Sequence, residues 1–341
     1  MNHFTYPLAN STWDQDEFDA MQRVIESSQF TMGERVKAYE RGFAHYQESR
    51  YAVMVNSGSS ANLLMVAALF FKSTRPLKPG DEVIVPAVSW STSYTPLHQY
   101  GLKLKFVDVD LETLNFDLDA LESAVSENTR LIMAVNLLGN PNEFHKITEI
   151  IGGREIVLIE DNCESLGAKF DGKKAGSFGV MGSFSSFFSH HISTMEGGII
   201  TTDDEELYHI LLSLRAHGWT RNLPKHNKIT PPTSDDPFEE SFRFVLPGYN
   251  VRPLELSGAI GVEQLKKLPN LIAGRRENAT IFQQVMTVHD DIIIQKECGD
   301  SSWFGFSMVL RPGAVRTRDE LRRSLAEKGF ECRPIVAGNF T

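Results

Sequence analysis

A run of small hydroxyl residues precedes an apolar, helix-like segment in the first quarter of the chain. The run is Asn56-Ser57-Gly58-Ser59-Ser60, and the apolar stretch 63–71 follows it. The first turn of a helix has free backbone N–H groups, and glycine lets a ligand approach the backbone, so this segment could bind a phosphate group. The same pattern is typical of an ordinary serine N-cap, and on these residues alone both interpretations stay open. Neither GxGxxG nor GxxxxGK[ST] occurs, which disfavours a dinucleotide site or a P-loop.

An acidic pair, Glu160-Asp161, ends an apolar run at residues 156–160. Ligands of open α/β sheets bind at the carboxyl ends of strands, and an acid there can pair with a protonated ring nitrogen. That pairing makes a pyridine ring an electron sink, as pyridoxal phosphate (PLP) chemistry requires. A helix-capping aspartate would explain the residue equally well.

Two adjacent histidines, His190 and His191, lie in the polar-aromatic stretch 184–198. No third ligand stands nearby at a metal-binding spacing, so we predict no metal site. A structural histidine is the commoner case. Imidazole can also move protons near neutral pH, which keeps a catalytic role open.

Short apolar segments alternate with helix-like ones between residues 50 and 215. Strands are predicted at 82–86, 105–109, 131–135 and 156–160, and helices near 92–100, 118–124 and 143–151. This order predicts a parallel sheet between helices. Further strands at 183–189 and 198–202 would flank the two histidines.

The C-terminal part of the chain has a different pattern. The polar, proline-rich stretch 221–248 predicts a long loop, and helices follow at 254–267 and 271–288. From about residue 292 we predict a strand-rich tail, with a helix at 317–328 and a strand into Cys332. We therefore expect a large α/β domain over residues 1–250. Residues 251–341 would form connecting helices and a small α+β domain.

Composition limits the class of protein. The net charge of −10 argues against binding to nucleic acid or to membrane surfaces, which requires clustered Lys and Arg. The N-terminus lacks the pattern of a signal peptide, and no apolar run is long enough to span a bilayer. Cys163, Cys298 and Cys332 are widely separated, which suits a reducing compartment without disulfides. We expect a cytoplasmic protein.

Five motifs together resemble one family. SGSSANLL, VPAVSWSTSY, EDNCESLGA, SFSSFFSHHISTMEGG and LPGYNVRPLE follow the order seen in the DegT/DnrJ/EryC1/StrS sugar aminotransferases. The resemblance runs from near Tyr6 to the last residue. It implies the fold-type I PLP-dependent (aspartate aminotransferase-like) α/β fold, with a mostly parallel central sheet and a smaller C-terminal α+β domain. It also implies a homodimer with shared active sites. Similar proteins continue for some tens of residues beyond Thr341, so we expect the small domain to be truncated.

Aligned on the downstream acidic-Gly-Gly, the family's cofactor-binding lysine falls at His190. Lysine attaches the cofactor through a covalent imine, whereas imidazole forms no stable imine. The replacement resembles a dehydratase subgroup of the family. It implies non-covalent PLP or pyridoxamine 5′-phosphate (PMP) and 3-dehydration of a GDP-linked 4-keto-6-deoxy sugar in colitose-type dideoxysugar biosynthesis. L-glutamate would regenerate PMP, with ammonia and 2-oxoglutarate released, and His190 would transfer protons.

The resemblance also implies the other site residues. Cofactor contacts are expected from Gly58, Ser59 and Ser185 (phosphate), Trp90 (ring face), Asp161 (ring nitrogen), Glu164 (ring hydroxyl) and Asn250 (the neighbouring subunit's phosphate). Substrate contacts are expected from Ser189, His217, Arg221 and Arg333. For the last three, a solvated or structural charge is equally compatible with the sequence. His191 is expected to be structural.

Three alternative functions fit parts of the sequence. An iron–sulfur-dependent dehydrase of CDP-linked sugars would need clustered cysteines, and the chain has none in sequence, so no iron–sulfur cluster is expected. An ordinary aminotransferase would need a lysine such as Lys173 or Lys174, both in a turn expected to be exposed. A non-catalytic relative that only binds nucleotide sugar is disfavoured by the presence of Asp161 and Trp90.

Overall fold

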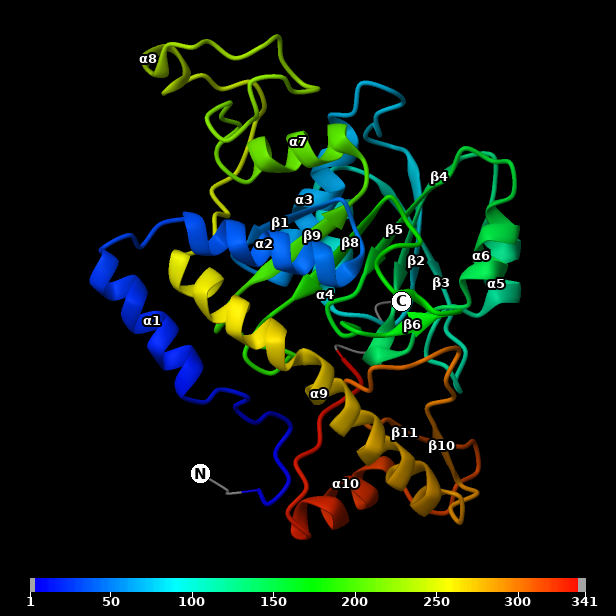
Figure 1. Ribbon diagram of the computed structural model, residues 1–341. Helices are drawn as coiled ribbons and strands as arrows, with labels where there is room; N and C mark the ends of the chain where they lie inside the picture. The colour runs from blue at the N-terminus through cyan, green and yellow to red at the C-terminus, as the bar shows by residue number, and fades with distance from the viewer. Residues whose placement is uncertain (1–3, 337–341) are drawn as a thin grey trace.

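A seven-stranded sheet forms the centre of the molecule in the computed structural model, which describes residues 4–336 (Figure 1). The strand order is β1-β9-β8-β5-β4-β2-β3. The strands are β1 (Tyr51–Val55), β2 (Glu82–Pro86), β3 (Lys103–Val107), β4 (Thr129–Val135), β5 (Val157–Asp161), β8 (Met181–Ser185) and β9 (Gly198–Thr202). Strands β3, β2, β4, β5 and β8 pair in parallel, whereas β9 runs antiparallel to both β8 and β1. The mostly parallel central sheet is thus confirmed.

Strand residues alternate between two apolar layers. Val83 and Val85 pack into one cluster with α3 (Gly58–Phe70), α4 (Ser91–Gln99) and α7 (Glu205–Leu214). Ile84 packs on the opposite face with α5 (Leu118–Ala124) and α6 (Phe144–Ile151). Because both faces of the sheet are covered, the central strands β2, β4 and β5 read as near-continuous apolar runs, as the sequence predicted. The strand predicted at 105–109 lies at Lys103–Val107 instead, and as an edge strand it is only partly buried.

A third cluster lies beneath β1 and β9. It joins Met54 and Ile199 to α2 (Glu34–Gln47) and to the first half of α9 (Glu255–Met286). Helix α1 (Gln15–Ser27) packs on the same part of α9 through Ala20, Val24 and Ala259. The predicted pair of helices at 254–267 and 271–288 is wrong, because α9 continues through Pro269 as one 32-residue helix.

The C-terminal part lies along the second half of α9 (Figure 1). It contains the antiparallel pair β10 (Ile292–Ile294) and β11 (Met308–Leu310), then α10 (Arg318–Glu327). The predicted strand into Cys332 is wrong: Phe330 makes one isolated bridge to Tyr6, and their rings stack at 4.5 Å. The division at residue 250 stays a prediction, since α9 packs on both parts.

The remaining elements are short. They are β6 (Lys169–Phe170), β7 (Lys173–Lys174), the 3₁₀ turn η1 (Leu137–Gly139) and α8 (Pro237–Glu240). The predicted loop at 221–248 is confirmed, apart from the short helix α8 within it. This loop, with α8, extends outward beyond α7 (Figure 1). Within residues 4–336, no helix is both long and apolar enough to cross a membrane.

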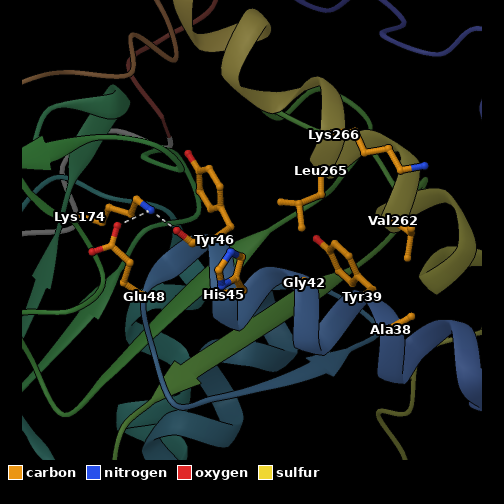
Figure 2. A pocket seen from close by; sticks show the side chains of 10 residues that line it. All are labelled: Ala38, Tyr39, Gly42, His45, Tyr46, Glu48, Lys174, Val262, Leu265 and Lys266. Carbon is orange, nitrogen blue, oxygen red and sulfur yellow. Dashed lines mark hydrogen bonds and ion pairs between the residues drawn. The ribbon is translucent and has the colours of Figure 1, made fainter.

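A cavity of about 590 Å³ lies between α2 and α9 (Figure 2). Tyr39, Val262 and Leu265 line its apolar part, and Lys174 lies at one end beside Glu48. None of the site residues expected from the sequence lines this cavity.

Candidate active site

The phosphate-binding segment is the start of α3. Ser57 caps the helix by accepting a hydrogen bond from the backbone N–H of Ser60 at 3.1 Å. Gly58 packs directly on Ser185 at the end of β8: a Cβ at position 58 would lie 2.6 Å from the Cβ of Ser185. The Ser59 hydroxyl donates to Thr92 Oγ1 at 3.0 Å. Three residues expected at one phosphate thus lie around one helix N-terminus.

Asp161 ends β5 with a buried and firmly held carboxylate. It accepts hydrogen bonds from Asn62 Nδ2 at 2.7 Å, from Ser93 Oγ at 2.8 Å and from the Cys163 N–H at 3.1 Å. Asn62 is itself oriented by the Ser183 hydroxyl, which donates to its Oδ1 at 2.6 Å. Sequence reasoning assigned no role to Asn62 or Ser93. Both lie within motifs already singled out, and Asn62 is one helical turn after Gly58.

Trp90 caps the N-terminus of α4, just before Thr92 and Ser93. Its side chain remains 52% exposed, which is unusual for tryptophan in a folded core. An aromatic face left open beside Ser93, a partner of Asp161, is available to stack on a ring.

Glu164 lies on the loop after β5, largely removed from solvent. Its Oε2 accepts a hydrogen bond from the Leu138 N–H at 3.0 Å, and Oε1 lies 4.0 Å from an Arg333 nitrogen. Burial raises the pKa of Glu164 to about 7, although the Leu138 hydrogen bond and the Arg333 charge oppose the shift. The structure therefore brings Arg333 to Glu164.

His190 lies in a turn between β8 and β9. The predicted strand 183–189 is wrong beyond Ser185, where β8 ends; the Ser186 N–H still bonds to Gly197 O at 2.9 Å, next to the last residue pair of β8 and β9. The Thr194 N–H also bonds to Ser186 O, at 2.8 Å, and closes the turn that contains Ser189 and His190.

The His190 ring is packed between aromatic neighbours. Its centroid lies 5.1 Å from that of Phe304 and 5.9 Å from that of Phe187. Burial lowers the pKa of His190 to about 4, with the charges of Arg333 and Arg275 acting in the same direction. The imidazole is therefore neutral at pH 7, and its buried Nδ1 has no hydrogen-bond partner among the described residues.

His191 faces the interior. It is 1% exposed, and its Nε2 lies 3.1 Å from the carbonyl oxygen of Ser302. Burial lowers the pKa of His191 well below its usual value. This position agrees with the structural role expected from the sequence.

His217, Arg221 and Asn250 gather at a different place, around Trp219. The rings of His217 and Trp219 lie 4.7 Å apart, and the Arg221 guanidinium lies 5.6 Å from the Trp219 centroid. Asn250 accepts a hydrogen bond from Arg252 Nε at 3.0 Å. A cavity of about 530 Å³ is lined by Asn56, Trp219, Arg221 and Asn250, among others. The contacts described for these three residues do not include His190, Asp161 or Glu164.

The two lysines nearest in sequence do not occupy the histidine turn. Lys174 is not exposed as expected: its ammonium pairs with Glu48 at 2.9 Å and donates to the Tyr46 carbonyl oxygen (Figure 2). Lys173 is exposed and lies over the Phe178 ring at 4.7 Å.

These residues fit a phosphorylated pyridine cofactor. At Gly58 even a methyl group would collide with Ser185, so the N-terminus of α3 and Ser185 lie close enough to bind one phosphate together. Asp161 presents a fixed carboxylate, Trp90 an open aromatic face, and His190 a neutral base. In residues 4–336 no three His, Cys, Asp or Glu side chains are grouped as metal ligands.

Comparisons with known proteins agree with this geometry. The sequence model of the DegT/DnrJ/EryC1/StrS aminotransferase family matches residues 11–338. The chain is 65% identical over 335 residues to the GDP-4-keto-6-deoxy-D-mannose 3-dehydratase of Yersinia pseudotuberculosis, covering 98% of this chain and 85% of that protein.

Two solved structures share the same fold. The GDP-4-keto-6-deoxy-D-mannose-3-dehydratase of E. coli with bound hydrated PLP superimposes with a TM-score of 0.98 at 62% identity, covering 99% of this chain and 87% of that one. A GDP-4-keto-6-deoxymannose-3-dehydratase with a trapped PLP-glutamate geminal diamine gives a TM-score of 0.97 at 62% identity, covering 98% and 87%. The aspartate aminotransferase-like class expected from the sequence is confirmed.

Proposed function

The chain belongs to the DegT/DnrJ/EryC1/StrS aminotransferase family, and we propose that within it the chain is a PLP/PMP-dependent dehydratase that removes the C3 hydroxyl of GDP-4-keto-6-deoxymannose. The product is GDP-4-keto-3,6-dideoxymannose. L-glutamate restores the amine form of the cofactor, and ammonia and 2-oxoglutarate are released. The observation that carries the proposal is a partly buried, neutral imidazole, His190, in the turn where aminotransferases of the family hold a lysine.

The cofactor would be held by groups that need no covalent bond. The N-terminus of α3 with Gly58 and Ser59, together with Ser185, would bind the phosphate. Trp90 would cover the ring, and Asp161 would pair with the ring nitrogen. Glu164 would face the ring hydroxyl. When bound, the amine form supplies a nucleophile for the C4 ketone and a conjugated ring that takes up electrons.

His190 would act as the acid–base group. An imidazole with a pKa near 4 is unprotonated at neutral pH, so its ring nitrogen can accept a proton. Once protonated, an imidazole with this lowered pKa gives up its proton more readily than ordinary histidine, and it can deliver that proton to the departing C3 hydroxyl oxygen. Ser189, the preceding residue of the same turn, would contact the sugar.

The lack of a lysine amine in this turn decides the outcome of the reaction. An amine there could displace the sugar amine and complete an amino transfer. Lys174 is held by Glu48 and Tyr46, and so is unavailable for this step. The neutral imidazole leaves elimination and hydrolysis as the route of release.

We propose further that the active enzyme is a homodimer with shared sites. His217, Arg221 and Asn250 form a half-site around Trp219, apart from the contacts of His190. Asn250 would reach the phosphate bound by the partner, and Arg221, His217 and the local Arg333 would bind the nucleotide sugar or glutamate. The three cysteines are free, which suits the reducing cytoplasm.

The direct test is incubation with GDP-4-keto-6-deoxymannose, PLP and L-glutamate, followed by mass spectrometry of the sugar. We expect the sugar to lose one oxygen atom at C3 and ammonia to appear in equal amount. The His190→Asn variant should bind cofactor yet lose about 10²- to 10⁴-fold in turnover. Formation of a 4-amino sugar by the wild-type protein would contradict the proposal.

Mixing variants tests the shared site. His190→Asn and Asn250→Ala should each be nearly inactive alone. If the sites are shared, mixed dimers carry one intact site, so subunit exchange should restore about a quarter of wild-type activity. No recovery after verified exchange would show that each chain completes its own site.

A further inference from the structure

Phe304 lies between two expected site residues, His190 and Arg333, and the structural His191. Its ring centroid is 5.1 Å from that of His190 and 5.6 Å from that of His191, and the Arg333 guanidinium carbon lies 5.7 Å from it. One aromatic ring thus contacts both the acid–base residue and the arginine that approaches Glu164.

The backbone that carries Phe304 is tied on the sheet side. The N–H groups of Ser302 and Phe304 donate to the carbonyl oxygens of Gly139 and Leu138 at 2.9 and 3.1 Å. Leu138 also donates its own N–H to Glu164. The 3₁₀ turn η1 therefore links the Phe304 segment to the carboxylate after β5.

The same segment is tied on the opposite side by α9 and by His191. Arg275 donates from Nη1 to the carbonyl oxygens of Trp303 and Phe304, both at 3.1 Å. Arg276 donates from Nε to Ser301 O at 3.0 Å, and His191 Nε2 lies 3.1 Å from Ser302 O. Four consecutive carbonyl groups are thus bonded to side chains, which is far more than a connecting loop needs.

We infer that Phe304 is a positioning residue. Arg275 and His191 fix the backbone of its segment, and its ring, which contacts both the His190 imidazole and the Arg333 guanidinium, fixes the position of one relative to the other. The inference deepens the proposed function and rests on it, because it gives His190 and Arg333 their working geometry. Sequence reasoning placed Phe304 only in a strand-rich tail.

The ring also sets the environment of His190. Phe304 covers one side of the imidazole and limits its contact with water there, while Phe187 contacts it from its own turn. The charged and titratable groups facing this pair are Arg275 from α9, Arg333 from the C-terminal segment, Glu164 beyond Arg333, and His191. Burial and both arginines lower the pKa of His190. A substitution that exposes the imidazole to solvent on the Phe304 side must therefore raise that pKa.

The test compares Phe304→Met, which keeps the side-chain volume but loses the aromatic ring, with Phe304→Tyr, which keeps the ring. Phe306→Leu is the matched control: Phe306 is 43% exposed and packs on Phe282 and Trp303, outside the site. The His190 titration is followed by NMR in cofactor-free protein, with its signal assigned by its absence in His190→Asn.

Phe304→Met should raise the His190 pKa by at least about one unit toward the ordinary value. It should also move the acid limb of the kcat profile to higher pH and raise the KM for L-glutamate severalfold through Arg333. Phe304→Tyr should resemble wild type. If Phe304→Met fails to fold, Arg275→Lys, which keeps the charge but loosens the segment, should shift the titration in the same direction.

The inference is overturned if the loosened variants titrate like Phe306→Leu and keep the wild-type KM for L-glutamate, because Phe304 would then only support the fold. The titration needs no turnover, so it stays decisive even if wild-type protein releases no ammonia from sugar and glutamate. That second result would instead refute the proposed function.

Discussion

Gly58 at the start of α3 and Ser185 at the end of β8 are packed so closely that a methyl group on Gly58 would lie 2.6 Å from the Ser185 Cβ. We predict that Gly58→Ala weakens cofactor binding at least tenfold, because the added carbon displaces Ser185 or the helix start that face the phosphate. The check is titration of the protein with PLP or PMP, followed by absorbance or fluorescence.

The matched control for this change is Gly274→Ala. Gly274 also lies in a helix, but a Cβ there meets nothing within 4 Å. Alanine should stabilise that helix by about 0.5–1 kcal/mol and leave cofactor affinity unchanged. Equal cofactor affinities in the two variants would show that Gly58 and Ser185 do not bind the phosphate.

The second prediction concerns covalent attachment. His190→Lys places a primary amine in the closed turn between β8 and β9, and that amine should form an imine with PLP. After borohydride reduction, the intact protein should gain the mass of the cofactor, which should also survive dialysis. His190→Arg, cationic but without a free amine, is the control. A His190→Lys protein that gains no mass would mean that this turn does not face the cofactor.

The third prediction concerns the ring nitrogen. Asp161→Asn keeps the shape of the side chain but removes the charge that Asn62, Ser93 and the Cys163 N–H hold in place. We expect turnover to fall by about 10²-fold or more, since a fixed charge opposite a developing charge contributes at that level. Asp171→Asn, at a side chain that is 75% exposed, should leave turnover unchanged. Steady-state assays of the two variants should show this difference in turnover clearly.

The fourth prediction follows from Glu164. Its pKa is about 7 in the folded protein against 4.5 in the unfolded chain, so the folded state binds the proton more tightly. This group therefore destabilises the cofactor-free fold increasingly as pH rises from 4.5 to 7, with the full penalty above 7. Glu164→Gln should gain thermal stability over wild type at pH 8 and lose that advantage below pH 4.5.

Melting curves of both cofactor-free proteins across pH 4 to 8 check this. Wild-type protein also contains His190, whose lowered pKa makes stability fall as pH drops from 6.5 toward 4. That contribution is common to both proteins and cancels in the difference. A difference in melting temperature that does not change with pH would show that Glu164 has the same pKa in the folded and unfolded chains.

The sequence alone allowed the doubly covered sheet to be predicted, because β2, β4 and β5 are buried on both faces and bounded by polar or glycine residues. Strand β1 was not predicted: Tyr51–Val55 is a short apolar run whose antiparallel partner, β9, lies 143 to 151 positions later in the chain. The end of β8 was missed because the apolar Phe187 and Phe188 continue the strand pattern, whereas the chain turns after Ser186 and the Thr194 N–H returns to the Ser186 carbonyl oxygen.

The candidate site was predicted where its residues lie in local motifs, as with Gly58, Asp161 and His190. Residues that act through distant packing gave no such signal. Phe304 reaches His190 only because α9 fixes residues 301–304 through Arg275 and Arg276, and α9 itself was expected to break near Pro269. Lys174 was expected to be exposed because its neighbours are polar, whereas Glu48 and Tyr46 come from a helix more than 120 positions earlier.

The closed turn between Ser186 and Gly197 is held by main-chain bonds, by two strands and by side chains other than that of residue 190, such as the Ser186 and Thr194 hydroxyls. Strand β9 begins so near α3 that a Cβ at Gly198 would lie 2.1 Å from the Ser57 carbonyl oxygen. None of these ties depends on which side chain position 190 carries. In such a fold, one replacement at position 190 can exchange a lysine that binds the cofactor covalently for a histidine that transfers protons, without a change in the backbone. New chemistry could therefore arise here in a single evolutionary step, and could be reversed as readily.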